Sequence, residues 1–485
     1  MRSQLISGSL WLTGAKVCTT AVGFLSTIIL ARLLVPEDFG LIAIAAASLA
    51  IATAVTDLPV AAALVQLEEP SRADYDTAWT ISLLRGLLVM LTLTGVAPLI
   101  AAAYGDERLI GVLVALSLSP LLLGGLNPYM VIFDRQLLFS RSFILETVSK
   151  VGSVLVSAIV AFQFRNYWAL VAGPLAAALI ALVLSYALAP YRPRPALASL
   201  RVLWGFSSWL TLVSIVNTLN LRLDQFIVGS VLGQRTLGHF SVGSDIANLI
   251  HAPVMPIMRT LYAGFSQLRG DRAALFNAYQ QSQRFLGNFA PPFGVGLALV
   301  AEPMVRITLG DVWVPAAIVI EILAPVFAFE LIAGATYPMV MSQGNTRALF
   351  WRDLTVLLFR LPLMAIGIIW FGLLGLLIAR AAASAFGLAL NIQLAQRVIG
   401  LTYKDVAAGV WRPLCGVTAM SVIVLGLRSV LDPTAAPLLF ILIAIPLGAV
   451  VYSTTVLGLW ILGGRRQGFE ADAFAIGKNL LGRSN

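Results

Sequence analysis

Charged residues occur well inside the apolar stretches of this chain. The basic ones are Lys16, Arg85, Lys150, Arg222, Arg360 and Arg380, and the acidic ones are Asp57, Glu146, Asp224, Asp245, Glu321 and Glu330. A charged side chain at the centre of a bilayer costs about 2.5–3.5 kcal/mol or more, so such residues face a protein interior or a wet cavity. They are the first candidates for binding a substrate or an ion.

The first apolar stretch carries a regular polar pattern. Thr13, Lys16, Thr20, Gly23 and Thr27 recur every three or four residues, which places them on one face of a helix. A stripe with one cation and several hydroxyls suits an anionic ligand that bears sugars. The alternative is a polar seam whose groups are satisfied by neighbouring helices.

A second polar face is predicted in residues 205–228. Ser214, Asn217, Asn220 and Asp224 lie near one face of that helix, with Arg222 to the side. Amides and a carboxylate can bind sugar hydroxyls, and they can equally hold the helix to its neighbours. Arg222 either contacts a ligand phosphate, pairs with Asp224 or extends to the lipid surface.

Two arginines and three acids complete the candidate site. Arg85 and Arg360 each lie about two turns from the predicted cytoplasmic end of a span, within reach of a ligand phosphate or a lipid phosphate. Asp57 precedes a Leu-Pro step, which predicts a kink that exposes it. Asp57, Asp245 and Glu330 are candidates for coupling to an ion or proton, and the alternative is a buried carboxyl that is protonated or paired.

Composition identifies the elements that must hold these residues. The chain has 485 residues, of which 59% are hydrophobic and 11% charged, and its mean hydropathy is +0.90. Soluble domains carry about 25% charged residues. Apolar stretches of about 20 residues recur about fourteen times, each long enough to cross a bilayer as a helix. The prediction is an all-α polytopic membrane protein with about 14 transmembrane helices.

The net charge of +9 is explained by the predicted topology rather than by nucleic acid. With the N-terminus in the cytoplasm, roughly twenty Lys and Arg residues fall in cytoplasmic segments and about six on the other side, as the positive-inside rule requires. Both termini are therefore predicted to be cytoplasmic. The first span shows no cleavage site and is predicted to remain in the protein.

The chain is predicted to form two six-helix lobes around a central cavity. Residues 1–189 form the N-terminal lobe, 190–204 a cytoplasmic linker, 205–397 the C-terminal lobe, 398–461 two additional spans and 462–485 a cytoplasmic tail. Within the second lobe, the FGLLG segment is expected to separate spans 352–371 and 373–396. Residues 267–285 are expected to form an amphipathic helix on the membrane, beginning at Asp271.

An internal repeat supports the two-lobe organisation. LARLLVPEDFGLIAI follows the first span, and VGSVLGQRTLGHFSV, residues 228–242, follows the seventh. Aligned without gaps, they pair Leu34 with Leu232 and Gly40 with Gly238. Pro36 fits the first position of the second span, where its missing N–H costs nothing. Two related bundles around a cavity are typical of transporters.

The sequence lacks the common motifs of ATP-using and zinc-dependent enzymes. The chain contains neither a GxxxxGK[ST] phosphate loop nor an HExxH motif, and His239 and His251 have no metal-ligand pattern around them. Cys18 and Cys415 lie in apolar stretches, which argues against a disulfide. No extracytoplasmic loop is large enough for a polysaccharide polymerase or glycosyltransferase. We therefore expect no catalytic residue, metal or cofactor, and no nucleic-acid partner.

The sequence resembles the polysaccharide-transport family of oligosaccharide flippases, within the multidrug/oligosaccharidyl-lipid/polysaccharide exporter superfamily. The resemblance lies in LARLLVPEDFGLIAIAAA, in DQFIVGSVLGQRTLGHFSVG at residues 224–243 and in FRLPLMAIGIIWFGLLGLLIARA at residues 359–381. It implies a bacterial inner-membrane flippase that works by alternating access. The implied substrate is an undecaprenyl-pyrophosphate-linked oligosaccharide repeat unit for capsule, exopolysaccharide or O-antigen. A polysaccharide polymerase and a chain-length regulator are candidate partners.

Two other transport functions remain open from the sequence. One is a cation-coupled small-molecule exporter of the multidrug type, which a cavity dominated by acids and aromatics would favour. The other is a flippase for the lipid-linked peptidoglycan precursor. The balance of buried cations and acids distinguishes these only modestly from the polysaccharide function.

Overall fold

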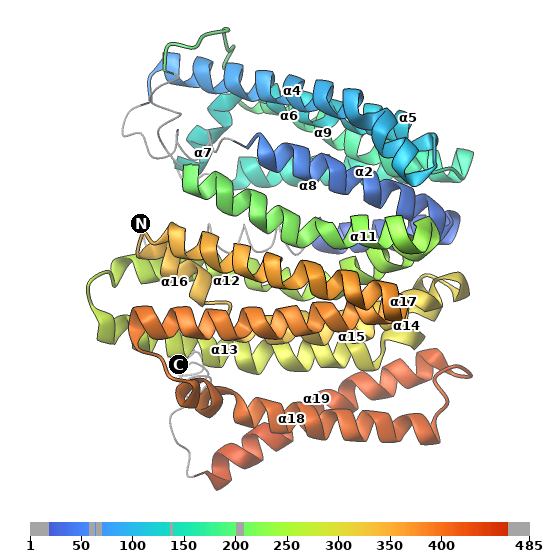
Figure 1. The fold of residues 1–485 in the computed structure, drawn as a ribbon, viewed down its shortest axis with the longest axis vertical. Helices are drawn as coiled ribbons and strands as arrows, with labels where there is room; N and C mark the ends of the chain where they lie inside the picture. The colour runs from blue at the N-terminus through green and yellow to red at the C-terminus, as the bar shows by residue number, and fades with distance from the viewer. Residues whose placement is uncertain (1–18, 58–63, 65–69, 136–138, 200–207, 464–485) are drawn as a thin grey trace, which may run out of the picture. The chain divides into compact units, whose positions relative to one another are not determined.

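The computed structural model describes residues 19–57, 64, 70–135, 139–199 and 208–463 (Figure 1). Within these residues the chain is helical and contains no β-strand, which confirms the predicted all-α class. It divides into two compact units, Met1–Val242 and Gly243–Asn485.

The first unit is a bundle of long and broken helices. Its elements are the helix Thr19–Leu33, α2 (Pro36–Val55), α4 (Arg72–Tyr104), α5 (Arg108–Leu116), α6 (Leu118–Gly124), η1 (Pro128–Met130), α7 (Val131–Arg135), α8 (Phe139–Phe164), α9 (Trp168–Leu188) and most of α11 (Ser208–Ala247). α8 packs along α9, and α4 packs against both α5 and α6 (Figure 1).

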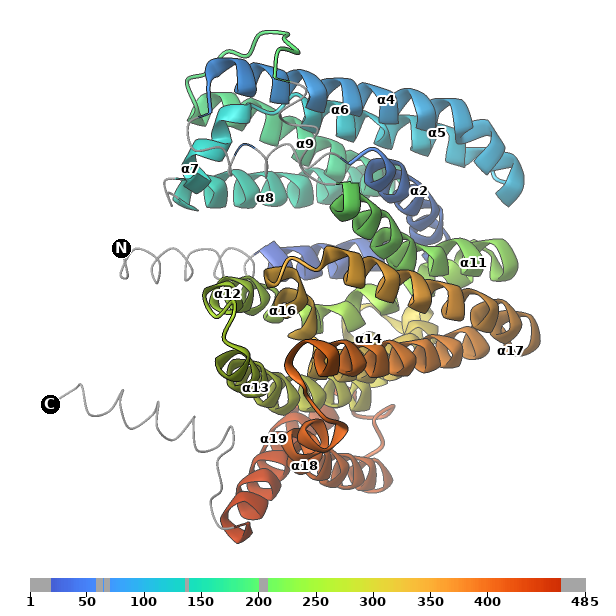
Figure 2. The same ribbon diagram turned by 60° about the vertical axis from the view of Figure 1, so that its left-hand side comes forward.

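The second unit continues the helical arrangement. Its elements are η2 (Asn248–His251), α12 (Val254–Gln267), α13 (Arg272–Leu299), α14 (Ala301–Thr308), η3 (Asp311–Ala316), α15 (Ala317–Glu330), η4 (Leu331–Ala333), α16 (Thr336–Ser342), α17 (Thr346–Ile399), α18 (Tyr403–Val430) and α19 (Pro437–Leu462). α13 packs against α15 and α18, and α18 lies beside α19 in both views (Figures 1 and 2).

Two bonds from side chains to main-chain carbonyls attach the last two helices to α13. The Tyr452 hydroxyl donates to the Asn288 carbonyl at 2.7 Å, and Arg428 Nη2 donates to the Leu299 carbonyl at 2.8 Å. Asn288 lies within the helix, but the residue four positions on is Pro292, which has no N–H, so the Asn288 carbonyl is open to Tyr452. Leu299 ends the helix, where a carbonyl lacks an intrahelical partner.

Membrane-spanning helices are abundant in the part of the chain that the structure describes. Eight helices there are long and apolar enough to cross a membrane, or up to nine if the bent pair α13 and α14 is one span. α17 is counted as one of these eight helices, although it consists of two segments. Each of the about fourteen stretches predicted from hydropathy overlaps a helix or a helical segment among the described residues, so the polytopic class is confirmed.

The longest helix, α17, is a hairpin of two segments. Gly372 has φ 59°, a left-handed conformation that glycine adopts without steric cost. A Cβ atom on Gly367 would overlap the Gly375 backbone, and one on Gly375 would overlap the Gly367 backbone. Residues this far apart in one continuous helix do not touch, so the chain reverses between them. The predicted split at FGLLG is confirmed.

The prediction of a separate surface helix at 267–285 is wrong. Asp271 does begin a helix, because its carboxylate accepts a hydrogen bond from Ala274 N at 2.9 Å. That helix, however, runs without interruption from Arg272 to Leu299 and includes Pro291 and Pro292. The amphipathic start and the following apolar span are therefore one element, α13.

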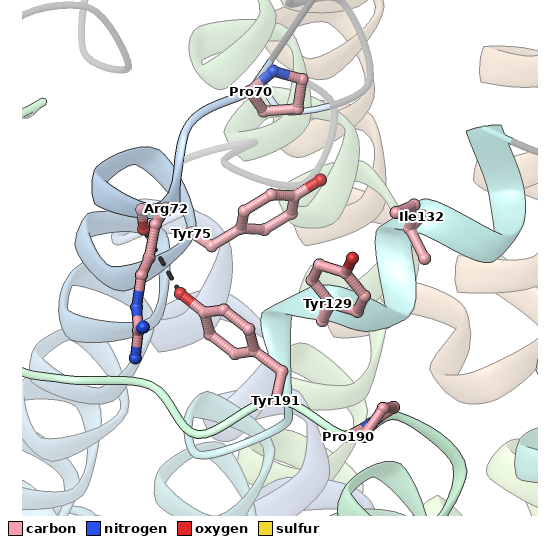
Figure 3. Close-up of a pocket in the computed structure, with 7 residues that line it drawn as sticks. All are labelled: Pro70, Arg72, Tyr75, Tyr129, Ile132, Pro190 and Tyr191. Atoms are coloured by element: carbon pink, nitrogen blue, oxygen red, sulfur yellow. Dashed lines mark hydrogen bonds between the residues drawn. The ribbon is translucent and has the colours of Figure 1, made fainter.

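The residues after α9 are bound along the first turns of α4. The buried Asp76 carboxylate accepts from the Tyr191 hydroxyl at 2.7 Å and from Arg194 N at 2.9 Å. One turn after Asp76 in α4, Thr80 Oγ1 accepts a hydrogen bond from Ala196 N at 3.0 Å. Tyr191 also donates to the Arg72 carbonyl at 3.3 Å (Figure 3). Much of the predicted linker is therefore bound to α4, and we call these residues after α9 the strap.

The two repeated hairpins pack on each other in a reciprocal way within the first unit. A Cβ atom on Gly40 would overlap the Gln234 backbone, and a Cβ atom on Gly238 would overlap the Pro36 backbone. The gap-free alignment that pairs Gly40 with Gly238 also pairs Pro36 with Gln234. Each hairpin therefore uses the same two positions against the other. The chain reverses before the second one at Gly233, where φ is 81°.

A side chain at Gly40 is expected to force these two hairpins apart. Gly40→Val should lower the thermal midpoint of the purified protein, because overpacking against a backbone that cannot move aside costs about 1–3 kcal/mol. Gly238→Val should do the same. The double variant should cost less than the sum of the two, since both changes break one shared contact. The midpoint is the temperature at which heating removes half of the monodisperse peak in size-exclusion chromatography.

Gly95→Val is the matched control for this prediction. Gly95 also lies within a helix, α4, and a Cβ atom there would meet no atom within 4 Å. Its midpoint should stay close to that of the wild type. Equal stability of Gly40→Val and Gly95→Val would contradict the reciprocal packing.

Candidate functional site

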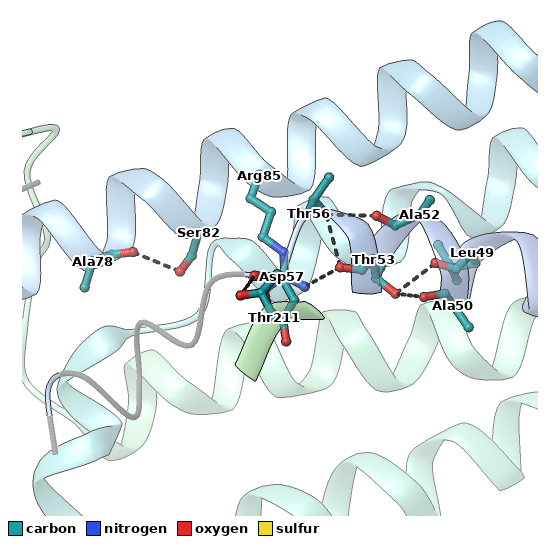
Figure 4. A network of polar contacts seen from close by, with 10 residues as sticks. All are labelled: Leu49, Ala50, Ala52, Thr53, Thr56, Asp57, Ala78, Ser82, Arg85 and Thr211. Atoms are coloured by element: carbon teal, nitrogen blue, oxygen red, sulfur yellow. Dashed lines mark hydrogen bonds and ion pairs between the residues drawn. The ribbon is translucent and has the colours of Figure 1, made fainter. Parts of the chain in front are cut away.

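An ion pair joins two of the predicted site residues, Asp57 and Arg85. Arg85 Nη1 lies 2.7 Å from Asp57 Oδ1, and Arg85 Nη2 donates to the Thr53 carbonyl at 3.2 Å (Figure 4). The two side chains are 29% and 40% exposed, so water or a ligand can reach both. Thr211 Oγ1 donates to the Asp57 carbonyl at 3.3 Å, which links the start of α11 to this pair.

The end of α2 creates this site. α2 ends at Val55, shortly before the Leu58-Pro59 step, whereas the sequence predicted a kink in a longer span there. Asp57 N bonds to the Ala54 carbonyl at 3.2 Å, so it does not use the Thr53 carbonyl as a continuing helix would. The Thr53 carbonyl is thereby available to Arg85. The same break releases the Asp57 side chain from the helix surface.

The polar face predicted on the first span is described only in part. Thr13 and Lys16 lie outside the described residues, whereas Thr20, Gly23 and Thr27 lie on the helix Thr19–Leu33. Lys150 of α8 reaches this face: its Nζ lies 3.4 Å from the position a Cβ atom would take on Gly23. The structure therefore adds a cation to the predicted face, close to Gly23.

The remaining predicted residues of the first unit lie on α11. Asn217 is exposed, and Asn220 and Arg222 are half-buried. Asp224, one turn further on, is 2% exposed. The exposure of Asn217 keeps it accessible to a ligand, and Arg222 is accessible in part. The Asn220 amide oxygen and Asp224 belong to the interior of the helix packing.

The second unit contains a buried cluster around Glu330. Glu330 accepts a hydrogen bond from the Ser384 hydroxyl. The Arg380 guanidinium lies 5.3 Å from the centre of the Phe327 ring, and His251 packs edge-on against that ring at 5.5 Å. His251 also interacts electrostatically with Glu330 and Arg380. η2, α15 and α17 each contribute to this cluster.

Two further predicted residues lie in the second unit. Arg360 is 5% exposed, and its Nε contacts Met364 Sδ at 3.1 Å. Asp245 is exposed and lies near the end of α11. Arg380 was among the charged residues identified in the sequence but received no specific role there, and His251 and Ser384 received none either. The placement of Arg380 and Ser384 beside Glu330 depends on the hairpin of α17, whereas His251 comes from η2.

A third polar cluster lies at the Tyr104 end of α4. Asp106 pairs with Arg108 at 2.7 Å and accepts from Gln234 Nε2 at 2.8 Å. Glu37 pairs with Arg235 at 3.5 Å. These contacts join the turn after α4, the start of α2 and the turn of the second repeated hairpin. We call Glu37, Asp106, Arg108, Gln234 and Arg235 the hairpin cluster.

Comparison with known proteins identifies a family. Residues 29–318, more than half of the chain, match the family model described as "Polysaccharide biosynthesis protein". Two curated relatives are the lipopolysaccharide biosynthesis protein WzxC of Escherichia coli (strain K12) and the succinoglycan biosynthesis transport protein ExoT of Rhizobium meliloti (strain 1021). WzxC is 21% identical over 85% of both chains, and ExoT is 26% identical over 70% of both.

A solved structure shares the fold. The lipid II flippase MurJ, in an inward closed conformation, superposes with a TM-score of 0.73 at 14% sequence identity. The match covers 94% of this chain and 99% of MurJ. The fold of this chain is therefore that of a known membrane transporter.

The Asp57–Arg85 ion pair is expected to contribute measurable coupling energy. Arg85→Asp should lower the thermal midpoint by leaving two acids together, and Asp57→Arg should lower it by leaving two cations together. The exchanged double variant should recover much of the loss, with a coupling energy of about 0.5–1 kcal/mol for a partly exposed pair. Strict additivity of the two single variants would show that the pair does not form. Arg306→Gln removes another partly exposed arginine, which pairs with Glu302 at 3.1 Å and with Asp311 at 2.7 Å, and is the control for loss of charge.

The protonation of Asp106 determines the pH at which the hairpin cluster loses stability. Hydrogen bonds from Arg108, and after it from Gln234, lower the pKa of Asp106 to about 2 despite partial burial. A lowered carboxyl pKa stabilises the folded state above the ordinary value of about 4, and this stabilisation is lost as the pH falls through about 2. We expect the midpoint difference between wild type and Asp106→Asn to stay constant from pH 8 to about 4. It should shrink below that, and a difference that disappears already at pH 6 would contradict the assignment.

Proposed function

We propose that this chain, which belongs to the polysaccharide biosynthesis protein family, is a flippase for lipid-linked oligosaccharides. Its substrate would be an undecaprenyl-pyrophosphate-linked repeat unit that crosses the bacterial inner membrane for exopolysaccharide, capsule or O-antigen assembly. The observation that carries the proposal is the family match over residues 29–318. The roles of the relatives WzxC and ExoT, in lipopolysaccharide biosynthesis and in succinoglycan biosynthesis transport, support the substrate class.

The cations along the first unit suit the anionic part of such a substrate. A pyrophosphate cannot enter hydrocarbon without replacement of its hydration, because an isolated charge there costs far more than binding energy can supply. Arginine and lysine in a wet cavity provide that replacement. We assign Lys16, Arg85 and Arg222 to the pyrophosphate and Arg360 to its entry. Lys150, which lies against Gly23 on the face predicted to carry Lys16, belongs with them.

Hydroxyl and amide groups would bind the sugars. Thr13 and Thr20 lie on the predicted face of Lys16, and Asn217 and Asn220 lie on α11. These side chains both donate and accept hydrogen bonds, as sugar hydroxyls do. The polyprenyl tail can remain in the lipid while the head passes.

The Asp57–Arg85 pair suggests how substrate and proton are coupled. A phosphate that binds Arg85 competes with Asp57 for the same guanidinium. Without that partner, the Asp57 carboxylate gains affinity for a proton or a cation. Asp245, which is exposed, and Glu330, with its Ser384, Arg380 and His251 neighbours, are the proposed coupling acids of the second unit.

We place the protein in the inner membrane with both termini in the cytoplasm, from the distribution of Lys and Arg. The linker end of α4 then faces the cytoplasm, and the hairpin cluster faces the periplasm. The lobes 1–189 and 205–397 would alternate access around a central cavity. In this scheme the hairpin cluster holds the periplasmic end closed. A polysaccharide polymerase and a chain-length regulator are the protein partners that this function would need.

Loss of the proposed cations should impair transport without impairing folding. Lys16→Ala and Arg222→Ala should each reduce translocation of lipid-linked oligosaccharide in proteoliposomes by about ten-fold or more, because one charge-assisted bond to phosphate contributes about 1.5–3 kcal/mol. Lys16→Arg, which keeps the charge, should retain most of the flux.

Insertion and thermal stability of each variant serve as the controls for folding. Arg165→Ala, a substitution in the short turn between α8 and α9, should leave flux unchanged. Wild-type flux in both Lys16→Ala and Arg222→Ala would refute the assignment of these cations. Absence of flux in the wild type with every lipid-linked oligosaccharide tried would refute the proposed function.

A further inference from the structure

A pocket lined by three tyrosines lies at the linker end of α4, outside the proposed pathway. Its volume is about 690 Å³, within the range of about 300–1,000 Å³ that small-molecule sites occupy. The residues that line it are Pro70, Arg72, Tyr75, Tyr129, Ile132, Pro190 and Tyr191 (Figure 3). They come from the start of α4, from η1 and α7, and from the strap after α9.

The tyrosine rings form a compact aromatic surface. Tyr129 and Tyr191 stack in parallel, with centroids 5.2 Å apart and an angle of 2° between the planes. Tyr75 tilts against both, at 5.3 Å and 5.9 Å, and is 5% exposed. Tyr75 is therefore the floor of the pocket, while the two stacked rings are only half-buried and can contact a ligand.

The surrounding contacts hold the rings in place before any ligand binds. The Tyr191 hydroxyl donates to the buried Asp76, and burial together with this bond raises the pKa of Tyr191. The Tyr129 main chain is held by Asn127, whose side-chain oxygen accepts from Tyr129 N at 3.0 Å. Asn127 also donates to the Ala189 carbonyl at 2.9 Å, which attaches η1 to the strap. Such preorganisation lowers the entropic cost of binding.

Polar groups remain available at this aromatic surface. The Tyr129 hydroxyl makes no hydrogen bond within the described part of the chain. The rings of Tyr75 and Tyr129 point toward the space between Pro70 and Ile132 (Figure 3). Arg72 is exposed at the rim, and its contact with Asp76 is long at 3.8 Å, so its guanidinium can also contact a ligand.

We propose that this pocket is a saccharide-binding site that receives the sugar part of the lipid-linked substrate on the cytoplasmic face. Sugar rings present apolar C–H faces that pack on aromatic rings, and hydroxyls that bond to a phenol or a guanidinium. Arg72 would in addition pair with the carboxylate of an acidic sugar. The assignment to the substrate rests on the proposed function; saccharide binding itself does not.

The spacing along α4 supports one ligand that uses both sites. Arg72 and Arg85 lie on the same helix, 13 residues apart by their numbers, or about 20 Å at 1.5 Å per residue. A repeat unit of several sugars has the length to place its pyrophosphate near Arg85 while a distal sugar occupies the tyrosine pocket. Binding the distal sugar first would orient the substrate before the phosphates leave water.

Saturation-transfer NMR on the full-length protein in nanodiscs tests the pocket. The probes are free glucose, galactose, N-acetylglucosamine and glucuronic acid at millimolar concentration. We expect transfer to the C–H protons of at least one probe, reduced more than five-fold in Tyr129→Ala. Tyr129→Phe, which keeps the ring, should reduce it two- to three-fold. Arg72→Gln should reduce transfer only to glucuronic acid.

Tyr403→Ala is the matched control, since Tyr403 is an exposed tyrosine at the start of α18 in the other unit. Its transfer should equal that of the wild type. Thermal midpoints report folding, and Tyr129→Phe keeps the test valid if Tyr129→Ala does not fold. No transfer to any probe in the wild type would overturn the proposal, as would equal transfer in wild type, Tyr129→Ala and Tyr129→Phe.

A transport assay separates this inference from the proposed function. Tyr129→Ala should raise the substrate concentration for half-maximal flux several-fold, with little change in the maximal rate. An unchanged half-maximal concentration would overturn the link between pocket and substrate. If the wild type translocates no oligosaccharide but the Tyr129-dependent NMR signal is present, the flippase function fails while saccharide binding by the pocket is supported.

Discussion

Gly40 and Gly238 allow two helix starts to approach until backbone meets backbone, and the polar chemistry of that end of the first unit follows from this approach. Helix N-termini carry partial positive charge, so bringing two together is unfavourable unless anions lie nearby. Glu37 and Asp38 occupy the first turn of α2, and Asp106 accepts from Gln234 at the start of the second. The carboxylates thus offset the repulsion that the close packing creates.

This arrangement has a consequence for opening. Side chains that interdigitate must be desolvated and repacked when two elements separate, whereas glycine positions meet along smooth backbone surfaces. Separation at the hairpin cluster would break polar contacts, such as those of Asp106 with Arg108 and Gln234, which water can replace. Apolar side chains also meet between the two repeated segments, because Ile44 lies beside Gly229 and is fully buried. Opening there would therefore also require some apolar side chains to repack.

The features that sequence predicted best are those set by local pattern. Spans followed from hydropathy, and the pairing of Gly40 with Gly238 followed from a repeat that the structure shows as reciprocal packing. The helix start at Asp271 was also visible. The continuity of α13 was not, because its charged first half and apolar second half differ in composition although the helix runs through both. Composition therefore indicates the surroundings of each part of a helix, but it does not show where the helix begins and ends.

The candidate sites were predictable as residues but not as groups. Asp57 and Arg85 were both chosen from the sequence, yet their pairing depends on where α2 ends and on the Thr53 carbonyl that this end makes available. The link from Glu330 to Ser384 and Arg380 depends on the reversal at Gly372, and the link to His251 on the packing of η2 beside α15. Tyr75, Tyr129 and Tyr191 carry no signal at all in the sequence, since three separate elements bring them together.

α4 connects these separate features. Its first turns hold the strap and the tyrosine pocket, its middle carries Arg85, and its end leads into Asp106 and Arg108. At 33 residues it is about 50 Å long, which exceeds the hydrocarbon thickness of about 30 Å. One continuous helix therefore begins at an aromatic surface, carries a cation in its middle and leads into an acid beyond its end, with Pro98 between the last two. In the proposed transport scheme, a change in the tilt of the part before Pro98 would move the tyrosine pocket and Arg85 together, so occupancy of the pocket and release of Asp57 would need no separate mechanical link.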